Sequence, residues 1–134
     1  MEILKNIDIM LVEDNEALAE VVKEILSRAG AAVWLFNDPR NALTVFKCDP
    51  KHFDVIVTDE TMPSLSGFEM AKQMLHIRPD TPIILNTGYN GHLSEKAVLT
   101  AGIGAFFEKP VDYKELIRTI RYLFDKANIL NKSA

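Results

Sequence analysis

Five side chains able to do polar chemistry follow short apolar runs at separate places in the sequence. Glu13 and Asp14 follow the first run, and Asp59 follows the third. Thr87 follows the fourth run, and Lys109 follows the fifth. Three carboxylates brought close together would repel one another and raise each other's pKa. A divalent cation that prefers hard oxygen ligands, above all Mg²⁺, relieves such repulsion, so these acids predict a magnesium site.

The same residues suit the transfer of a phosphoryl group. A carboxylate such as Asp59 can act as the nucleophile and form an aspartyl-phosphate. A metal ion and Lys109 would both stabilise the equatorial phosphoryl oxygens and offset the charge of the acids. Taken singly, Asp59 could be a turn residue and Lys109 a solvated surface lysine. It is their combination that favours chemistry.

The elements that must position these residues alternate between strand and helix. Strands are expected at 7–12, 32–36, 55–58, 82–86 and 105–107. Helices are expected at 15–29, after Asp38-Pro39, around 68–75, at 93–101 and from Asp112 to about Phe124. Such alternation predicts a parallel sheet with helices on both faces. The carboxyl ends of parallel strands share one edge, where open α/β folds build their sites, and that edge would gather the five residues.

Composition is that of an ordinary globular domain. The chain has 134 residues, 48% hydrophobic and 25% charged, with a net charge of −4. The mild acidity argues against nucleic-acid binding through a basic surface. No apolar run approaches the roughly 18 residues of a membrane span. The single cysteine, Cys48, cannot form an internal disulfide, and with no export signal at the start we expect a cytoplasmic protein.

We expect residues 1–134 to form a single domain. Its core should extend over about 6–125, with the last helix ending near Phe124. A short C-terminal tail of roughly ten residues would follow, too short for a second domain.

The motifs around these residues resemble the receiver domain of two-component response regulators. They are Val12-Glu13-Asp14, Thr58-Asp59 with Met62-Pro63 and Gly67, Thr87-Gly88, and Phe106 with Lys109-Pro110. The resemblance covers roughly residues 6–125 and includes every position on which the family's chemistry rests. It implies an α/β, flavodoxin-like fold: a three-layer, doubly wound, five-stranded parallel sheet in the order 2-1-3-4-5.

The resemblance also implies how the site works. Glu13, Asp14 and Asp59 would bind Mg²⁺, and the backbone carbonyl of Thr61 would complete the metal shell. Asp59 would accept a phosphoryl group from the phosphohistidine of a histidine kinase or histidine phosphotransfer domain. The protein would then catalyse only its own phosphorylation and dephosphorylation, with no separate substrate.

A second set of implied roles concerns the response to phosphate. Lys109 and Thr87 would contact the phosphoryl group, and Phe106 would occupy an aromatic switch position that turns inward as Thr87 moves. The change would reach a surface read by a downstream protein partner, with no direct contact to nucleic acid or membrane. Asn86 departs from the apolar residue more usual at that strand position. Tyr89 is hypothesised to shield the phosphoryl group from water.

Three other functions compete with this interpretation. A flavodoxin-like FMN carrier needs a hydroxyl- and glycine-rich loop after the first strand, where this chain has Glu13 to Glu16. An aspartate-nucleophile phosphatase needs an acid two residues after the nucleophile, where this chain has Thr61. A receiver that acts only as a phosphorylation-independent docking module would not need all five polar positions.

Overall fold

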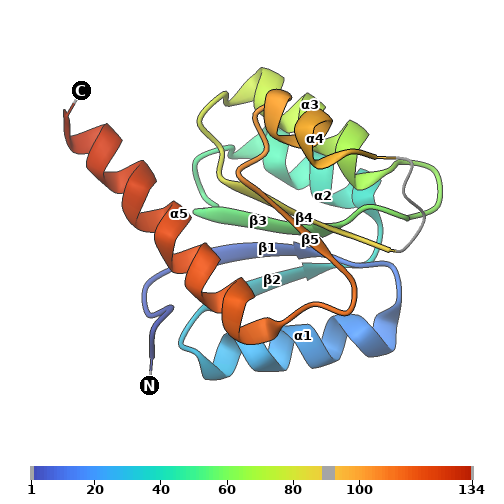
Figure 1. Cartoon of the computed structure of the whole chain (residues 1–134), viewed down its shortest axis with the longest axis horizontal. Helices are drawn as coiled ribbons and strands as arrows, with labels where there is room; N and C mark the ends of the chain where they lie inside the picture. The colour runs from blue at the N-terminus through green and yellow to red at the C-terminus, as the bar shows by residue number, and fades with distance from the viewer. Residues whose placement is uncertain (1, 89–92, 134) are drawn as a thin grey trace.

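Strands and helices alternate along residues 2–88 and 93–133, the parts of the chain that the computed structural model describes (Figure 1). The strands are β1 (Asp8–Val12), β2 (Ala32–Phe36), β3 (Val55–Asp59), β4 (Ile83–Thr87) and β5 (Ala105–Glu108). The helices are α1 (Glu16–Arg28), α2 (Pro39–Cys48), α3 (Gly67–Ile77), α4 (Glu95–Thr100) and α5 (Tyr113–Ser133). Each end of a predicted strand therefore falls within one residue of the corresponding end of an observed strand.

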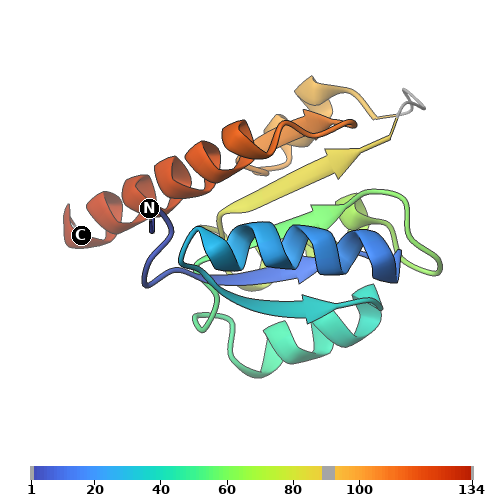
Figure 2. The same cartoon turned by 90° about the horizontal axis from the view of Figure 1, so that it is seen from below.

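The five strands form one parallel sheet in the order β2-β1-β3-β4-β5. Helices α1 and α5 cover one face of it, and α2, α3 and α4 cover the other (Figures 1 and 2). This confirms the predicted doubly wound α/β fold and its strand order. The order changes direction at β1, so the carboxyl ends of β1 and β3 flank the point where such sheets bind ligands.

The apolar sequence of β3 fits its place at the centre of the sheet, where both of its faces are covered. All five of its residues are buried, as expected for a central parallel strand. Alternate side chains enter different cores: Val55 and Val57 pack with α1 and α5, whereas Ile56 packs with α2, α3 and α4. This double burial fixes the position of Asp59 at the end of the strand.

Side-chain caps fix the starts of four helices close to the strand ends. Asn15 accepts a hydrogen bond from the backbone N–H of Leu18, and Asp38 accepts one from that of Arg40. Ser66 and Ser94 cap α3 and α4 in the same way. The loops that leave the carboxyl edge of the sheet are therefore anchored at their far ends.

The C-terminal helix is longer than predicted. The expected tail after about Phe124 is wrong, because α5 continues to Ser133 and extends past the sheet (Figure 1). Residues 126–133 contain no glycine or proline that would stop the helix. Ala127 continues its inner face beside a pocket lined by Pro79 and Pro82. Among the described residues, no helix, α5 included, is both long and apolar enough to cross a bilayer.

Candidate functional site

Three carboxylates meet at the carboxyl edge of the sheet. Glu13 follows β1 and Asp59 ends β3, and each is only 6% exposed, whereas Asp14 is half-buried. One carboxylate oxygen from each of the three lies within 4.8 Å of the others. Hard oxygen ligands at this spacing fit a divalent cation such as Mg²⁺.

Lys109 comes to these acids from the loop between β5 and α5. Its Nζ lies 2.8 Å from Oδ1 of Asp59 and 3.6 Å from Oε1 of Glu13. The backbone N–H of Lys109 donates to the carbonyl oxygen of Thr87 at 2.8 Å, which ties this loop to the end of β4. Burial works to lower the pKa of Lys109, but the hydrogen bond and charge of Asp59 outweigh it and raise this pKa, so the ammonium stays charged.

The pKa of Glu13 is raised above its ordinary value. Burial is the largest cause that raises this pKa, and the negative charge of Asp59 raises it further. A hydrogen bond from the backbone N–H of Asn15, 3.1 Å from Oε2, and the charge of Lys109 oppose the shift without cancelling it. Three acids share the one ammonium of Lys109, so a bound cation would offset the remaining negative charge.

The remaining predicted residues border this cluster. Thr87 ends β4, half-buried, and its hydroxyl donates to the carbonyl oxygen of Gly88 at 3.3 Å. Thr61 lies exposed in the loop after β3. Phe106 is half-buried on β5, opposite Leu85 on β4, and packs against the core beneath α2, α3 and α4. Tyr89 lies outside the described residues.

Each of the two adjacent phenylalanines on β5 packs against a core. Phe106 packs against one core, and Phe107 packs against the other, beneath α1 and α5. Alternation along the strand does place the two rings on opposite faces, but helices cover both faces of this sheet.

Glu60 is a structural member of the site that sequence reasoning did not single out. Its Oε1 accepts a hydrogen bond from the backbone N–H of Phe68 at 2.8 Å, and its backbone N–H donates to the carbonyl oxygen of Asn86 at 2.8 Å. Burial raises the pKa of Glu60. These bonds bind the loop after Asp59 to α3 and β4. In the sequence, Glu60 simply follows Asp59 at a strand end. Nothing there distinguishes a glutamate that binds the backbone from one that faces solvent.

Gly67 shows how closely this loop approaches Asp59. A Cβ at position 67 would lie 2.1 Å from the backbone oxygen of Asp59, so no larger residue fits without moving the loop. Asn37, also missed in the sequence, donates from Nδ2 to the backbone oxygen of Glu13 at 2.9 Å. Gly67 belongs to the motif that the sequence showed, whereas no local sequence pattern pointed to the bond from Asn37.

The comparisons with known proteins agree with this geometry. The sequence profile of the response regulator receiver domain matches residues 9–121. This chain belongs to that family. The match makes the flavodoxin-like FMN carrier the weaker interpretation, since the receiver family accounts for the acids after β1.

Two relatives show how far the receiver domain extends. Response regulator MprA of Mycolicibacterium vanbaalenii is 33% identical over 115 residues, which are 86% of this chain and 49% of that protein. A 14.6 kDa protein encoded in the sodA1 3′ region of Leptolyngbya boryana is 30% identical over 124 residues, 90% of this chain and 92% of that protein. The receiver domain thus spans about half the length of the MprA relatives it matches.

Solved structures support the fold. A response regulator receiver domain protein from Clostridium thermocellum superposes with a TM-score of 0.88 at 23% identity. The alignment covers 92% of this chain and 98% of that one. At this identity the similarity establishes the shared fold.

Proposed function

We propose that this receiver domain accepts a phosphoryl group on Asp59, with Mg²⁺ held by Glu13, Asp14 and Asp59. The observation that carries the proposal is the cluster of three acids with the Lys109 ammonium 2.8 Å from Asp59. Bound Mg²⁺ would supply positive charge to the phosphoryl oxygens as they approach the acids. The backbone carbonyl of Thr61, in the loop after β3, is a further proposed ligand.

The donor we propose is a phosphohistidine of a histidine kinase or a histidine phosphotransfer domain. A carboxylate oxygen of Asp59 attacks phosphorus, the phosphorus–nitrogen bond breaks, and the imidazole leaves with the bonding electrons. Before transfer, the Lys109 ammonium contacts the negative charge of Asp59. After transfer it would donate to a phosphoryl oxygen instead. No other substrate is expected to turn over.

The response that we propose begins at Thr87. Its hydroxyl now makes a 3.3 Å bond to its neighbour Gly88, which is long for a bond between oxygens and is readily exchanged for one to a phosphoryl oxygen. Phe106 would turn inward as Thr87 moves. Together they would alter the surface of α4, β5 and α5, where a downstream protein partner reads the phosphorylated state. The cytoplasmic setting stays a prediction.

A labelling experiment with a matched pair of variants tests the assignment of Asp59. Phosphoramidate, a small donor with a phosphorus–nitrogen bond, should label the wild-type protein in the presence of Mg²⁺. Asp59→Asn should remove the label, whereas Asp54→Asn, which changes the aspartate at the other end of β3, should keep it. Unchanged labelling of Asp59→Asn would overturn the proposal, and intact mass together with circular dichroism would show that both variants are folded.

A further inference from the structure

Glu60 lies in the chain between the phosphoacceptor and the proposed backbone ligand of the metal. Asp59 precedes it, and Thr61, whose carbonyl is a proposed ligand of Mg²⁺, follows it. A carbonyl ligand has no side-chain rotamer to adjust, so its direction depends on the backbone dihedral angles around it. Whatever fixes the backbone at position 60 therefore influences how well the loop after β3 can bind a cation.

All three polar groups of Glu60 are bonded to backbone atoms. Its N–H donates to the carbonyl oxygen of Asn86 at 2.8 Å, and its carbonyl oxygen accepts from the N–H of Gly67 at 2.9 Å. Its Oε1 accepts from the N–H of Phe68 at 2.8 Å. Glu60 thus joins the end of β3 to β4 on one side and to the start of α3 on the other.

The two bonds to α3 close the loop formed by residues 61–66. Gly67 and Phe68 are the first two residues of α3, so the chain leaves position 60 and returns to it. The carboxylate also meets the positive end of the helix dipole, which strengthens its bond to Phe68. This bond is the one of the three that a substitution at position 60 removes, because the other two use backbone atoms.

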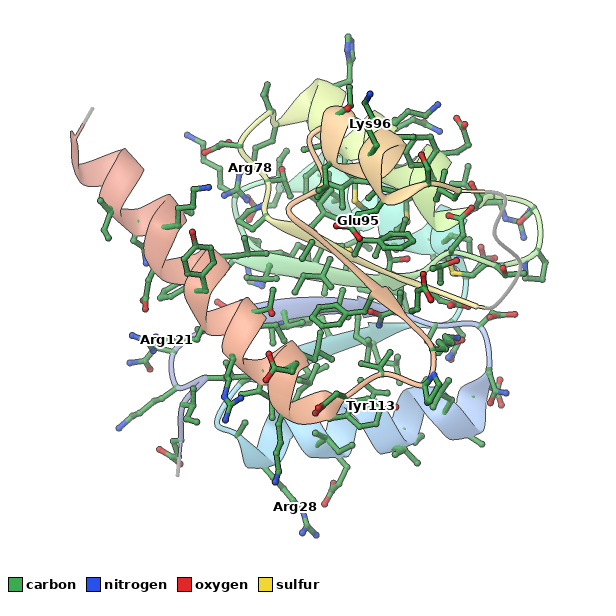
Figure 3. All side chains as sticks on the ribbon, viewed as in Figure 1. Arg28, Arg78, Glu95, Lys96, Tyr113 and Arg121 are labelled. Carbon is green, nitrogen blue, oxygen red and sulfur yellow. The ribbon has the colours of Figure 1, made fainter. Side chains whose placement is uncertain are left out.

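The body of α3 is a fixed base for this bond. Met70, Ala71 and Met74 are fully buried in the core beneath α2, α3 and α4, and side chains fill the space between α3 and the sheet (Figure 3). A Cβ at Gly67 would collide with the backbone oxygen of Asp59, so the first turn of α3 already lies against the end of β3. A loop held to this helix is therefore held to the core of the domain.

A second bond at the start of α3 does not involve Glu60. Oγ of Ser66 accepts from the N–H of Glu69 at 3.1 Å and caps the helix. This bond joins Ser66 to its own helix, whereas the bond of Glu60 joins the helix to the residue directly after Asp59. The two bonds therefore separate the stability of α3 from the position of the loop beside the acids.

We propose that Glu60 is a positioning residue that strengthens the binding of Mg²⁺. Its carboxylate, bonded to Phe68, holds the start of the loop, so that the carbonyl of Thr61 loses less conformational freedom when the cation binds. Among the described residues, Glu60 does not belong to the acidic cluster, and it acts through Thr61. The inference rests on the proposed function, which assigns the Thr61 carbonyl to Mg²⁺.

Glu60→Ala and Glu60→Gln are a matched pair of variants. Both remove the negative charge, but the amide oxygen of glutamine can accept the bond from Phe68. Titration with Mg²⁺ alone, followed by NMR without a phosphodonor, gives the Kd. The Kd should be about 3- to 10-fold higher in Glu60→Ala than in Glu60→Gln, the effect of one hydrogen bond next to a metal site. Equal Kd values in the two variants would overturn the inference.

Ser66→Ala separates this role from helix capping. It should lower the midpoint of urea unfolding about as much as Glu60→Ala does, since each variant removes one bond to the start of α3. Its Kd for Mg²⁺ should stay at the wild-type value. A Kd that rises in Ser66→Ala as much as in Glu60→Ala would assign the effect to a loosened helix and overturn the inference.

Hydrogen exchange in the wild-type protein gives a second readout. If the bond to Phe68 strengthens the binding of Mg²⁺, the ion must stabilise that bond by the same factor. The Phe68 amide should therefore exchange about 3- to 10-fold more slowly at saturating Mg²⁺, whereas the Glu69 amide, bonded to Ser66, should not change. The same change in both amides, or no change in either, would overturn the inference.

Failure of the inference can be told apart from failure of the proposed function. A wild-type protein that binds no Mg²⁺ would overturn both. Normal binding of Mg²⁺ that Glu60→Ala leaves unchanged would overturn the inference alone. Binding that depends on Glu60, in a protein that phosphoramidate does not label, would support the inference and overturn the phosphoryl transfer proposed for Asp59.

Discussion

Charged side chains at the two edges of the sheet differ in whether the protein supplies them with partners. At the amino edge, Nη1 of Arg78 donates to the backbone oxygens of Pro50 and Phe53 at 3.0 and 2.9 Å, and its Nε faces Asp80 at 3.3 Å. Asp54 accepts a hydrogen bond from the backbone N–H of Asp8 at 2.8 Å. Charges there have fixed partners within the protein.

At the carboxyl edge, the charges are not matched. Glu13, Asp14 and Asp59 share Lys109, and the nearby Oδ1 of Asn86 has no partner among the described residues. Satisfied polar groups stabilise a fold, whereas unsatisfied ones cost stability and persist where a ligand completes them. The difference separates a structural edge from a functional one, and each prediction below changes one edge and compares it with the other.

The largest effect is expected for Lys109→Met. Removal of one preorganised donor to a developing charge slows a reaction by about 100- to 1000-fold, so phosphoramidate labelling should slow by that factor. Stopped-flow or gel-based labelling at saturating Mg²⁺ measures it. Lys114→Met, which removes an exposed lysine at the start of α5, is the matched control and should label at the wild-type rate. A similar loss in both variants would mean that general surface charge, rather than the contact to Asp59, sets the rate.

Arg78→Met should show the reverse at the amino edge. Two backbone oxygens would lose their donor, which should lower the free energy of unfolding by about 3 kcal/mol in urea titrations. Labelling of the folded variant should stay at the wild-type rate. Arg28→Met, which breaks an exposed 2.7 Å pair with Glu24, should cost only about 0.3 kcal/mol. Comparable losses of stability in the two variants would show that the bonds of Arg78 to the backbone stabilise the fold no more than an exposed ion pair does.

A smaller effect is expected from Mg²⁺ itself. At ten times its Kd, the ion should raise the free energy of unfolding by about 1.4 kcal/mol. The raised pKa of Glu13, due first to burial, means that its contribution to stability is full below its ordinary pKa of 4.5 and is lost as the pH rises through the folded value.

Glu13→Gln should therefore be more stable than wild type at pH 7 without Mg²⁺ and should gain less from the ion. Thermal unfolding with and without Mg²⁺ compares the two proteins. If Glu13→Gln is instead less stable than wild type in metal-free buffer, the contacts of the Glu13 carboxylate with Lys109 and Asn15 stabilise the fold by more than its burial destabilises it.

The smallest effect concerns the pH dependence of the amino edge. Burial raises the pKa of Asp54 above its ordinary value of 3.8, and the hydrogen bond from Asp8 opposes this shift in part. The stability that Asp54 contributes is thus lost as the pH rises through the folded pKa. Asp54→Asn, whose amide oxygen can accept the same bond, should flatten the dependence of unfolding free energy on pH above the ordinary pKa of 3.8. A steeper dependence in the variant would contradict this sign.

Much of the fold follows from local sequence. The β3 run Val55 to Thr58 is apolar or β-branched, and caps such as Asn15 and Ser66 sit where helices begin, so element type is encoded in neighbouring residues. The convergence of Glu13, Asp59 and Lys109 also followed, because parallel strands must end at one edge.

Other features depend on contacts between distant segments. The sequence carries no positive signal for where α5 ends. Only the absence of glycine and proline is compatible with its continuation to Ser133. The bond from Glu60 to Phe68 and the approach of Gly67 to the Asp59 backbone arise from how one loop folds back. Asn86 stood out by type in an apolar strand, but its unpaired oxygen is visible only once the sheet and its helices are assembled.

A crystal structure with Mg²⁺ and beryllium fluoride, a mimic of the phosphoryl group, tests most directly whether the carboxyl edge is a phosphoacceptor site. We predict the fluoride complex on the Asp59 carboxylate, Mg²⁺ held by Glu13, Asp14 and Asp59, and the Lys109 ammonium on a fluoride. Neither ion at this edge, or the complex bound at another carboxylate, would contradict the proposed function and favour a phosphorylation-independent docking module.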